Sequence, residues 1–112
     1  PGTGSQLEKG DYNNVLNIPI PANLDGKEYM RKFDEEVFPF LQSFNPDILI
    51  ISAGFDAHRR DPLANINLEA EDYAYMTRQC LRIHSNLLIG LEGGYDLQAL
   101  RDCSVSVVNE LV

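Results

Sequence analysis

The chain has 112 residues, of which 44% are hydrophobic and 23% are charged, a composition ordinary for one small domain with a single core. Its formal net charge is −8, with 17 acidic against 9 basic residues and no basic patch, so we expect no direct binding to nucleic acid. No apolar run approaches the roughly 20 residues that a membrane-spanning helix needs, and the polar, glycine-rich opening does not read as a secretory leader. We therefore expect one soluble domain over residues 1–112, without membrane association and located in the cytoplasm.

The first part of the chain predicts a strand followed by a helix. Residues 14–20, "NVLNIPI", are a short apolar segment closed by Pro19 and Pro21, which is typical of a strand and its end. Residues 26–44 then switch to helical spacing of the apolar positions, with charged side chains on the other side. Pro39 lies inside this pattern and removes one main-chain donor, so we expect a kink or an interrupted last turn there.

Two continuous apolar runs dominate the rest of the chain. Residues 47–53, "DILIISA", and 86–92, "NLLIGLE", suit parallel strands that are covered by helices on both faces. Residues 69–84 predict a helix between them, with acidic side chains crowded into its first turn, and residues 97–111 predict a final helix. The alternation of strand and helix predicts an α/β domain of three layers, with a mainly parallel sheet and right-handed crossovers.

The two cysteines and one of the two histidines fall inside this helical pattern. Cys80 and Cys103 show no metal-ligand spacing, which favours buried free thiols in a reducing compartment. His84 ends the apolar stripe of the helix over 69–84, which favours an interior or boundary residue over a ligand.

Polar side chains follow both apolar strands at the point where each strand ends. Ligands of open parallel sheets bind beyond the carboxyl ends of the strands, where Asp56 and Tyr95 lie. We expect the two side chains within roughly 10 Å of each other, about two strand spacings. Asp56 is either a cap or turn former or a hard oxygen ligand for a metal. His58 completes a D-x-H pair with it, and the alternative for His58 is an exposed loop histidine.

The residues around Tyr95 have two interpretations each. Gly93 and Gly94 form an ordinary turn, or they let the main chain pass close to a ligand and aim the next side chain into the crevice. The Tyr95 hydroxyl is a neutral donor suited to an oxyanion that forms only in a transition state. Glu92 and Asp96 flank this turn as acid–base candidates, although solvated or capping roles are the commoner ones.

Four segments taken together resemble the histone deacetylase family, which includes acetylpolyamine amidohydrolases and bacterial deacetylase-like amidohydrolases. They are "PGTG" at 1–4, "NIPIP" at 17–21, "PDILIISAGFDAHRRDPLA" at 46–64 and "LEGGYDL" at 91–97. The sequences of the last two segments, at 46–64 and 91–97, are similar to those of the class II and bacterial branches of the family. The resemblance runs through the whole chain in order, but it covers only the C-terminal portion of a family member.

The resemblance implies an arginase/deacetylase α/β fold and a zinc-dependent hydrolysis of an acetylamide, from acetyl-lysine or an acetylpolyamine. It implies that Asp56 is one of three protein ligands of zinc and that Tyr95 donates to the substrate carbonyl as this becomes an oxyanion. Gly93 and Gly94 match the main chain beside the acyl group, whereas His58 matches no ligand of the family.

The resemblance also implies that two further zinc ligands and a tandem-histidine base lie N-terminal to residues 1–4. Zinc catalysis needs about three protein ligands, an open position and a base. Our first hypothesis is therefore a segment of a zinc-dependent deacetylase that is inactive by itself. The alternative is a non-catalytic α/β module that acts through binding or self-association. In both cases the apolar strands lack neighbours, so we expect a homo-oligomer.

Overall fold

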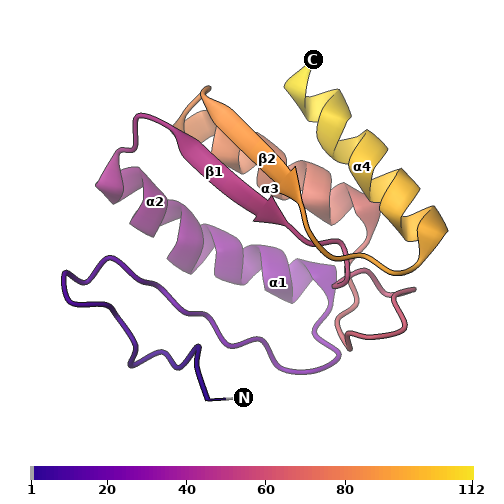
Figure 1. Ribbon diagram of the computed structural model, residues 1–112, viewed down its shortest axis with the longest axis horizontal. Helices are drawn as coiled ribbons and strands as arrows, with labels where there is room; N and C mark the ends of the chain where they lie inside the picture. Colours follow the sequence, from indigo (N-terminus) through magenta and orange to yellow (C-terminus); the bar gives the residue numbers. More distant parts are fainter. Residues whose placement is uncertain (1) are drawn as a thin grey trace.

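The computed structural model describes residues 2–112. Its sheet has two parallel strands, and the helices pack on one face of that sheet (Figure 1). The elements in chain order are α1 (Gly26–Lys32), the π-helical turn η1 (Phe33–Val37), α2 (Phe38–Phe44), β1 (Leu49–Ala53), α3 (Ala70–Ile83), β2 (Leu87–Leu91) and α4 (Leu97–Leu111). The predicted α/β class is confirmed, as are both apolar strands and the helices that follow them.

The sheet consists of β1 and β2, paired in parallel so that Leu49 lies opposite Leu87 and Ala53 opposite Leu91. Alternate residues of both strands face the helices, and the intervening residues face outward. On the outer face, Ile50 is 67% exposed and Leu88 is 56% exposed. Residues 2–112 thus form two layers, and the predicted helical cover of the outer sheet face is not made by these residues.

The predicted helix over 26–44 forms, with its irregularity placed before Pro39 instead of at it. The Asp25 carboxylate caps the start by accepting the main-chain N–H of Glu28 at 2.9 Å. In η1 the N–H of Phe38 donates to the carbonyl of Phe33, five residues earlier. Because a proline ring collides with the carbonyl four residues before it, the wider π-helical turn relieves that contact and lets the helix continue.

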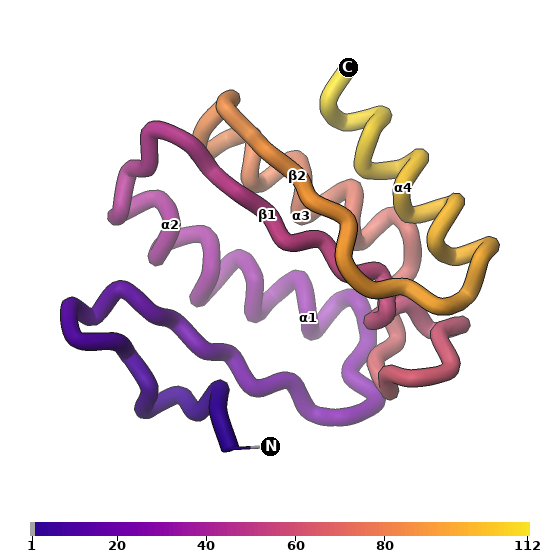
Figure 2. The backbone as a smooth tube through the Cα atoms, viewed as in Figure 1, coloured from indigo at the N-terminus to yellow at the C-terminus, as the bar shows by residue number. Residues whose placement is uncertain are grey.

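The predicted strand over residues 14–20 is wrong. The structure has an extended segment there without strand pairing, and it runs beside α1 and α2 instead of beside the sheet (Figure 2). Ile18 and Ile20 line a small pocket together with side chains of the helices, including Phe33. The apolar residues of this segment therefore contact helices, and within residues 2–112 no strand pairs with it.

The core lies between the inner sheet face and the helices. Its larger cluster joins the loop after β1 to α3 and α4, and comprises Phe55, Leu68, Tyr73, Cys103 and Val107. Cys80 belongs to a second cluster, with Phe33 and Leu49. The prediction of buried free thiols is confirmed, and burial raises the pKa of Cys80 to about 11 and that of Cys103 to about 12. Among the described residues, no helix has the length and apolar character needed to cross a membrane.

Candidate active site

The carboxyl ends of β1 and β2 place two polar loops at the same edge of the sheet (Figure 1). Asp56 follows β1 and Tyr95 follows β2. Main-chain hydrogen bonding continues past the strands, because the N–H of Phe55 donates to the carbonyl of Gly93 at 2.8 Å. This bond ties the two loops together directly beside the candidate residues.

Asp56 and Tyr95 share one small space next to Gly93. A Cβ atom on Gly93 would lie 2.8 Å from Oδ2 of Asp56 and 3.4 Å from Oη of Tyr95. A Cβ on Gly54 would lie 3.0 Å from Oδ1 of the same carboxylate. The expected approach of Asp56 and Tyr95 is therefore confirmed. The carboxylate stands against two glycines, and a side chain at Gly93 would displace it.

Gly94 is needed for a different reason. Its φ of 135° is a conformation that residues with a Cβ rarely adopt, and a Cβ there would lie 3.2 Å from Cβ of Phe55. The turn before Tyr95 therefore combines a close approach at Gly93 with an unusual main-chain conformation at Gly94. This arrangement fits both interpretations that the sequence left open, a turn and a close main-chain approach to a ligand.

Asp61 is a component of the site that sequence reasoning missed. Its buried carboxylate accepts the main-chain N–H of Tyr95 at 2.8 Å through Oδ2, and that of Leu63 at 2.8 Å through Oδ1. Burial by itself would raise the pKa of Asp61, but these hydrogen bonds outweigh it and hold the pKa below its ordinary value. The only sequence signal is the dipeptide Asp61-Pro62, which indicates a turn and not a contact 34 residues away.

His58 does not occupy an exposed loop position, and the prediction that it does is wrong. The residue is 4% exposed, because the loop after β1 folds back and His58 pairs with Leu68 in a short parallel bridge. Nδ1 accepts the main-chain N–H of Arg60 at 3.2 Å, and Nε2 lies 3.6 Å from a carboxylate oxygen of Glu69. Both ring nitrogens therefore contact this loop and the start of α3 instead of Asp56.

The remaining titratable candidates have structural contacts. The exposed Glu92 accepts a hydrogen bond from Oγ of Ser52 at 2.8 Å. Asp96 caps α4 by accepting the N–H of Ala99 at 2.7 Å. Glu92 is therefore solvated and Asp96 is a helix cap, which are the commoner roles expected for them. His84 ends α3 as a half-buried residue, and its Nδ1 accepts the N–H of residue 86 at 2.9 Å, so its boundary position is confirmed.

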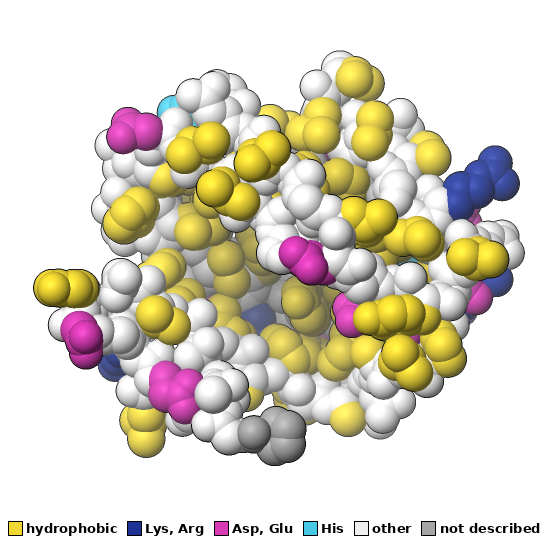
Figure 3. All heavy atoms as spheres, in the orientation of Figure 1, with side chains coloured by type: hydrophobic (Ala, Val, Ile, Leu, Met, Phe, Trp, Pro, Cys, Tyr) yellow, Lys and Arg dark blue, Asp and Glu magenta, His cyan; other side chains and the backbone are white. Residues whose placement is uncertain are grey.

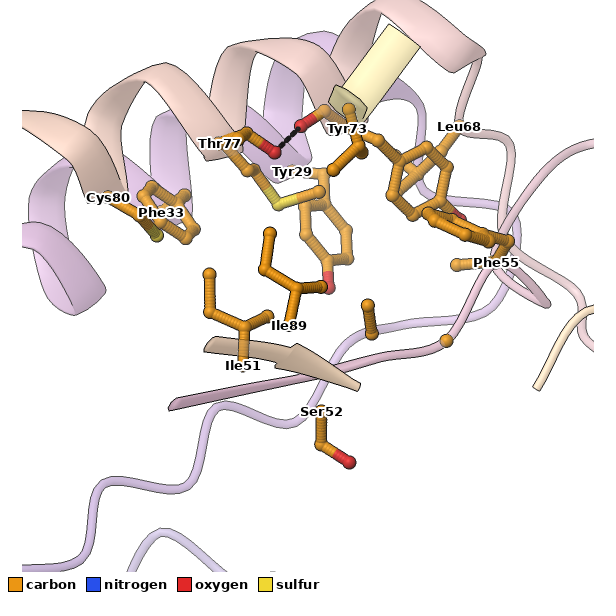
Figure 4. A pocket seen from close by; sticks show the side chains of 15 residues that line it. Tyr29, Phe33, Ile51, Ser52, Phe55, Leu68, Tyr73, Thr77, Cys80 and Ile89 are labelled. Carbon is orange, nitrogen blue, oxygen red and sulfur yellow. Dashed lines mark hydrogen bonds between the residues drawn. The ribbon is translucent and has the colours of Figure 1, made fainter. Parts of the chain in front are cut away.

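A cavity of about 210 Å³ lies on the inner side of the sheet, between the strands and α1 and α3 (Figure 4). Ile51 and Ile89 point into it from the strands, whereas Ser52 points away to the outer face. Neither Asp56 nor Tyr95 lines this cavity, which is mostly apolar. We therefore assign it to the packing of the core and not to the crevice beyond the strand ends.

The negative charge of Asp56 affects the pKa values of Tyr29 and Tyr73 in the core. Burial, and after it the Asp56 carboxylate, raises the pKa of Tyr29. Burial also raises the pKa of Tyr73, whose hydroxyl is enclosed and has no hydrogen-bond partner among the described residues. On its inner side Asp56 therefore faces neutral, weakly acidic groups.

Within residues 2–112, no group of three or more His, Cys, Asp and Glu side chains is arranged to hold a metal ion. A tetrahedral zinc ion takes about four ligands, of which a catalytic site supplies three from the protein. Asp56 offers one carboxylate at the sheet edge. Asp56 by itself would supply one of these ligands, and the described residues supply no full set.

Residues 1–111 match the model of the histone deacetylase domain. The chain belongs to the histone deacetylase family. The resemblance inferred from the sequence motifs is thereby confirmed, and the conclusion covers the family and a part of its domain.

Relatives and solved structures agree with this assignment. The whole chain is 45% identical to an uncharacterized protein of Synechocystis, of which it covers 37%. It is 37% identical over 108 residues to histone deacetylase 14, chloroplastic, of Arabidopsis thaliana, with 89% of this chain and 26% of the relative covered.

The crystal structure of the HDA15 HD domain matches with a TM-score of 0.93 at 34% identity, over 99% of this chain and 33% of that one. The structure of the histone deacetylase Clr3 matches with a TM-score of 0.82 at 33% identity, over 86% of this chain and 16% of that one. The partial arginase/deacetylase fold is thus confirmed. The chain spans about a third of the Synechocystis relative and of the HDA15 domain.

Proposed function

We propose that this chain supplies one part of the active site of a zinc-dependent deacetylase. In this proposal Asp56 is a zinc ligand, the Tyr95 hydroxyl is the oxyanion donor, and the main chain at Gly93 and Gly94 lies beside the acyl group of the substrate. The observation that carries the proposal is the shared space beside Gly93, where the Asp56 carboxylate and the Tyr95 hydroxyl meet at the carboxyl edge of parallel strands.

The chemistry of the two side chains is complementary. A zinc ion held partly by Asp56 would polarise the acyl carbonyl and make a bound water more acidic. The Tyr95 hydroxyl would donate to the carbonyl oxygen of the substrate as negative charge develops on it, which is an interaction stronger in the transition state than in the ground state. Gly93, which has no side chain, leaves room for the acyl group between the two.

Neither of the two histidines is placed to act as the base that takes a proton from water. The ring nitrogens of His58 contact Arg60 and Glu69, and His84 lies before β2, at the opposite end of the strand from Tyr95. In our proposal the base and the remaining zinc ligands come from the rest of a deacetylase domain. The substrate is an acetylated amine, acetyl-lysine or an acetylpolyamine, and the net charge of −8 favours a cationic one.

We expect residues 1–112 by themselves to bind no stoichiometric zinc and to hydrolyse no acetyl-lysine peptide. One carboxylate alone binds zinc too weakly to hold it. General acid–base catalysis, which typically raises the reaction rate by about 10²- to 10⁴-fold, would also be missing. The measurement is metal analysis of the purified chain, followed by a deacetylation assay with added zinc, beside Asp56→Ala and Tyr95→Phe. One zinc per chain, with turnover that both substitutions abolish, would show that these residues build a complete site.

A second candidate function is a non-catalytic module that associates with copies of itself. Apolar side chains gather over the strands and α4 on the face shown in Figure 3. On the outer sheet face Ile50 and Leu88 are 67% and 56% exposed, and an apolar surface of this kind favours association. Within residues 2–112 the outer edges of the two strands have no strand partner, so they offer main-chain groups that another chain can pair with.

This candidate predicts that the purified chain is a dimer or a higher oligomer by light scattering at high concentration. Ile50→Lys should then shift it to the monomer, because a charge would be buried at the interface. Leu7→Lys, at a position that is 88% exposed in the N-terminal segment, is the matched control and should leave the oligomer intact. A clean monomer of the unsubstituted chain contradicts self-association.

We propose the cytoplasm as the compartment, since two buried free thiols suit a reducing environment. The relative from Arabidopsis is named chloroplastic. Fractionation of cells that express the protein distinguishes a plastid from the cytoplasm.

A further inference from the structure

The carboxylate of Asp61 joins the loop after β1 to the turn after β2. Asp61 is 8% exposed, and both of its oxygens accept hydrogen bonds from main-chain N–H groups. Oδ2 accepts from Tyr95 at 2.8 Å, and Oδ1 accepts from Leu63 at 2.8 Å and from Ala64 at 3.4 Å. The N–H of Asp61 donates to the carbonyl of His58 at 2.8 Å, which fixes the loop from which the carboxylate extends.

Tyr95 depends on this contact more than on packing. Tyr95 is 56% exposed, and it follows Gly94, whose φ of 135° is accessible to few other residues. A main chain with this much freedom needs an external anchor to hold the next residue in one place. The N–H of Tyr95 finds that anchor in Asp61.

Arg60, the residue before Asp61, contacts the residues that follow the turn at Gly94 and Tyr95. Nη2 of Arg60 donates to Oε1 of Gln98 at 2.9 Å, and its Nε lies 3.5 Å from Oδ1 of Asp96. The Arg60 side chain is 42% exposed, and such ion pairs contribute little. Of these two neighbours, the buried Asp61 is the one that contacts the Tyr95 main chain directly.

We propose that Asp61 is a positioning residue, which holds the main chain at Tyr95 and so sets the distance between the Tyr95 hydroxyl and the Asp56 carboxylate. The importance of this distance for catalysis rests on the proposed function, whereas the anchoring itself does not. Hydrogen bonds to a charged acceptor are stronger than those between neutral groups, and the lowered pKa keeps Asp61 charged at neutral pH.

The test is amide hydrogen exchange measured by NMR in the wild type and in Asp61→Ala. We expect the Tyr95 and Leu63 amides to exchange about tenfold faster or more in the variant, as the loss of hydrogen bonds to a charged group implies. The amide of Phe55, which donates to Gly93, and that of Glu92, which donates to Ala53, should keep their rates. This contrast distinguishes local release of Tyr95 from general destabilisation of the fold.

Asp61→Asn sharpens the test, because it preserves shape but supplies a single acceptor oxygen. The amide group must turn its N–H₂ toward either Tyr95 or Leu63, so one of these two amides should lose its protection while the other retains it. Asp47→Ala, at an exposed aspartate before β1, is the control and should change neither.

An unchanged exchange rate of the Tyr95 amide in Asp61→Ala would overturn the proposal. In the complete domain, Asp61→Ala should also lower kcat without loss of zinc. A wild-type domain without deacetylase activity would contradict the proposed function, and the exchange rates would still decide whether Asp61 anchors Tyr95.

Discussion

Replacing Tyr95 by Phe should lower kcat for an acetyl-lysine peptide by about 10²- to 10³-fold in the complete deacetylase domain, with KM nearly unchanged. The substitution removes one oxygen at the edge of the sheet and preserves the ring. The lost hydrogen bond is one that forms fully only as the carbonyl oxygen of the substrate becomes an oxyanion, so the loss appears in kcat and not in substrate binding.

The matched control for this prediction is Tyr75→Phe. The Tyr75 hydroxyl lies on α3 and donates to Oδ2 of Asp34 at 2.7 Å, so its removal also costs a hydrogen bond, but one away from the strand ends. Steady-state kinetics of both variants give the comparison. A Tyr95→Phe enzyme with the kcat of the wild type would remove the tyrosine from the chemistry and leave it a role in shaping the loop.

Asp56→Ala should reduce turnover in the complete domain by more than about 100-fold. Mutation of a residue that only hydrogen-bonds to a metal ligand typically lowers metal affinity or activity by about 10- to 100-fold, and loss of a ligand itself should cost more. The carboxylate stands between Gly54 and Gly93, at positions where a Cβ would approach it to 3.0 and 2.8 Å. Neither glycine offers a replacement ligand, and His58 is occupied by other contacts. The metal would be left with an incomplete set of ligands.

Asp47→Ala is the control for the loss of a carboxylate. Asp47 precedes β1 at the end opposite to Asp56, and it is exposed. Its main-chain carbonyl, which accepts the side-chain amide of Asn86 at 3.3 Å, is unaffected by the substitution. Turnover should stay at the wild-type value in this variant, and equal losses in both variants would point to stability instead of a ligand role.

The sequence was sufficient wherever one physical rule decided the outcome. Continuous apolar runs predicted β1 and β2, and the periodicity of apolar residues predicted α3 and α4. Because parallel strands end at one edge of a sheet, their order alone predicted that Asp56 and Tyr95 approach each other. The family motifs added the fold and the family, which the comparisons confirm.

Tertiary contacts decided the features that the sequence did not reveal. The segment over residues 14–20 is as apolar as a strand, but it packs against helices, and a residue pattern does not state its partner. The sequence places His58 in a loop, and its burial results from a contact of that loop with Leu68, which the sequence does not show. Asp61 contacts Tyr95 through a main-chain N–H, and such a contact depends on no particular side chain at the partner position.

The central claim, that Asp56 is a zinc ligand, is tested most directly by the zinc content of the purified complete domain. The measurement is inductively coupled plasma mass spectrometry on the wild type, Asp56→Ala and Asp47→Ala after equal exposure to a weak chelator. We expect about one zinc ion per chain in the wild type and in Asp47→Ala, and little or none in Asp56→Ala, as the loss of one of three protein ligands implies. An Asp56→Ala domain that retains one zinc ion per chain would contradict the account.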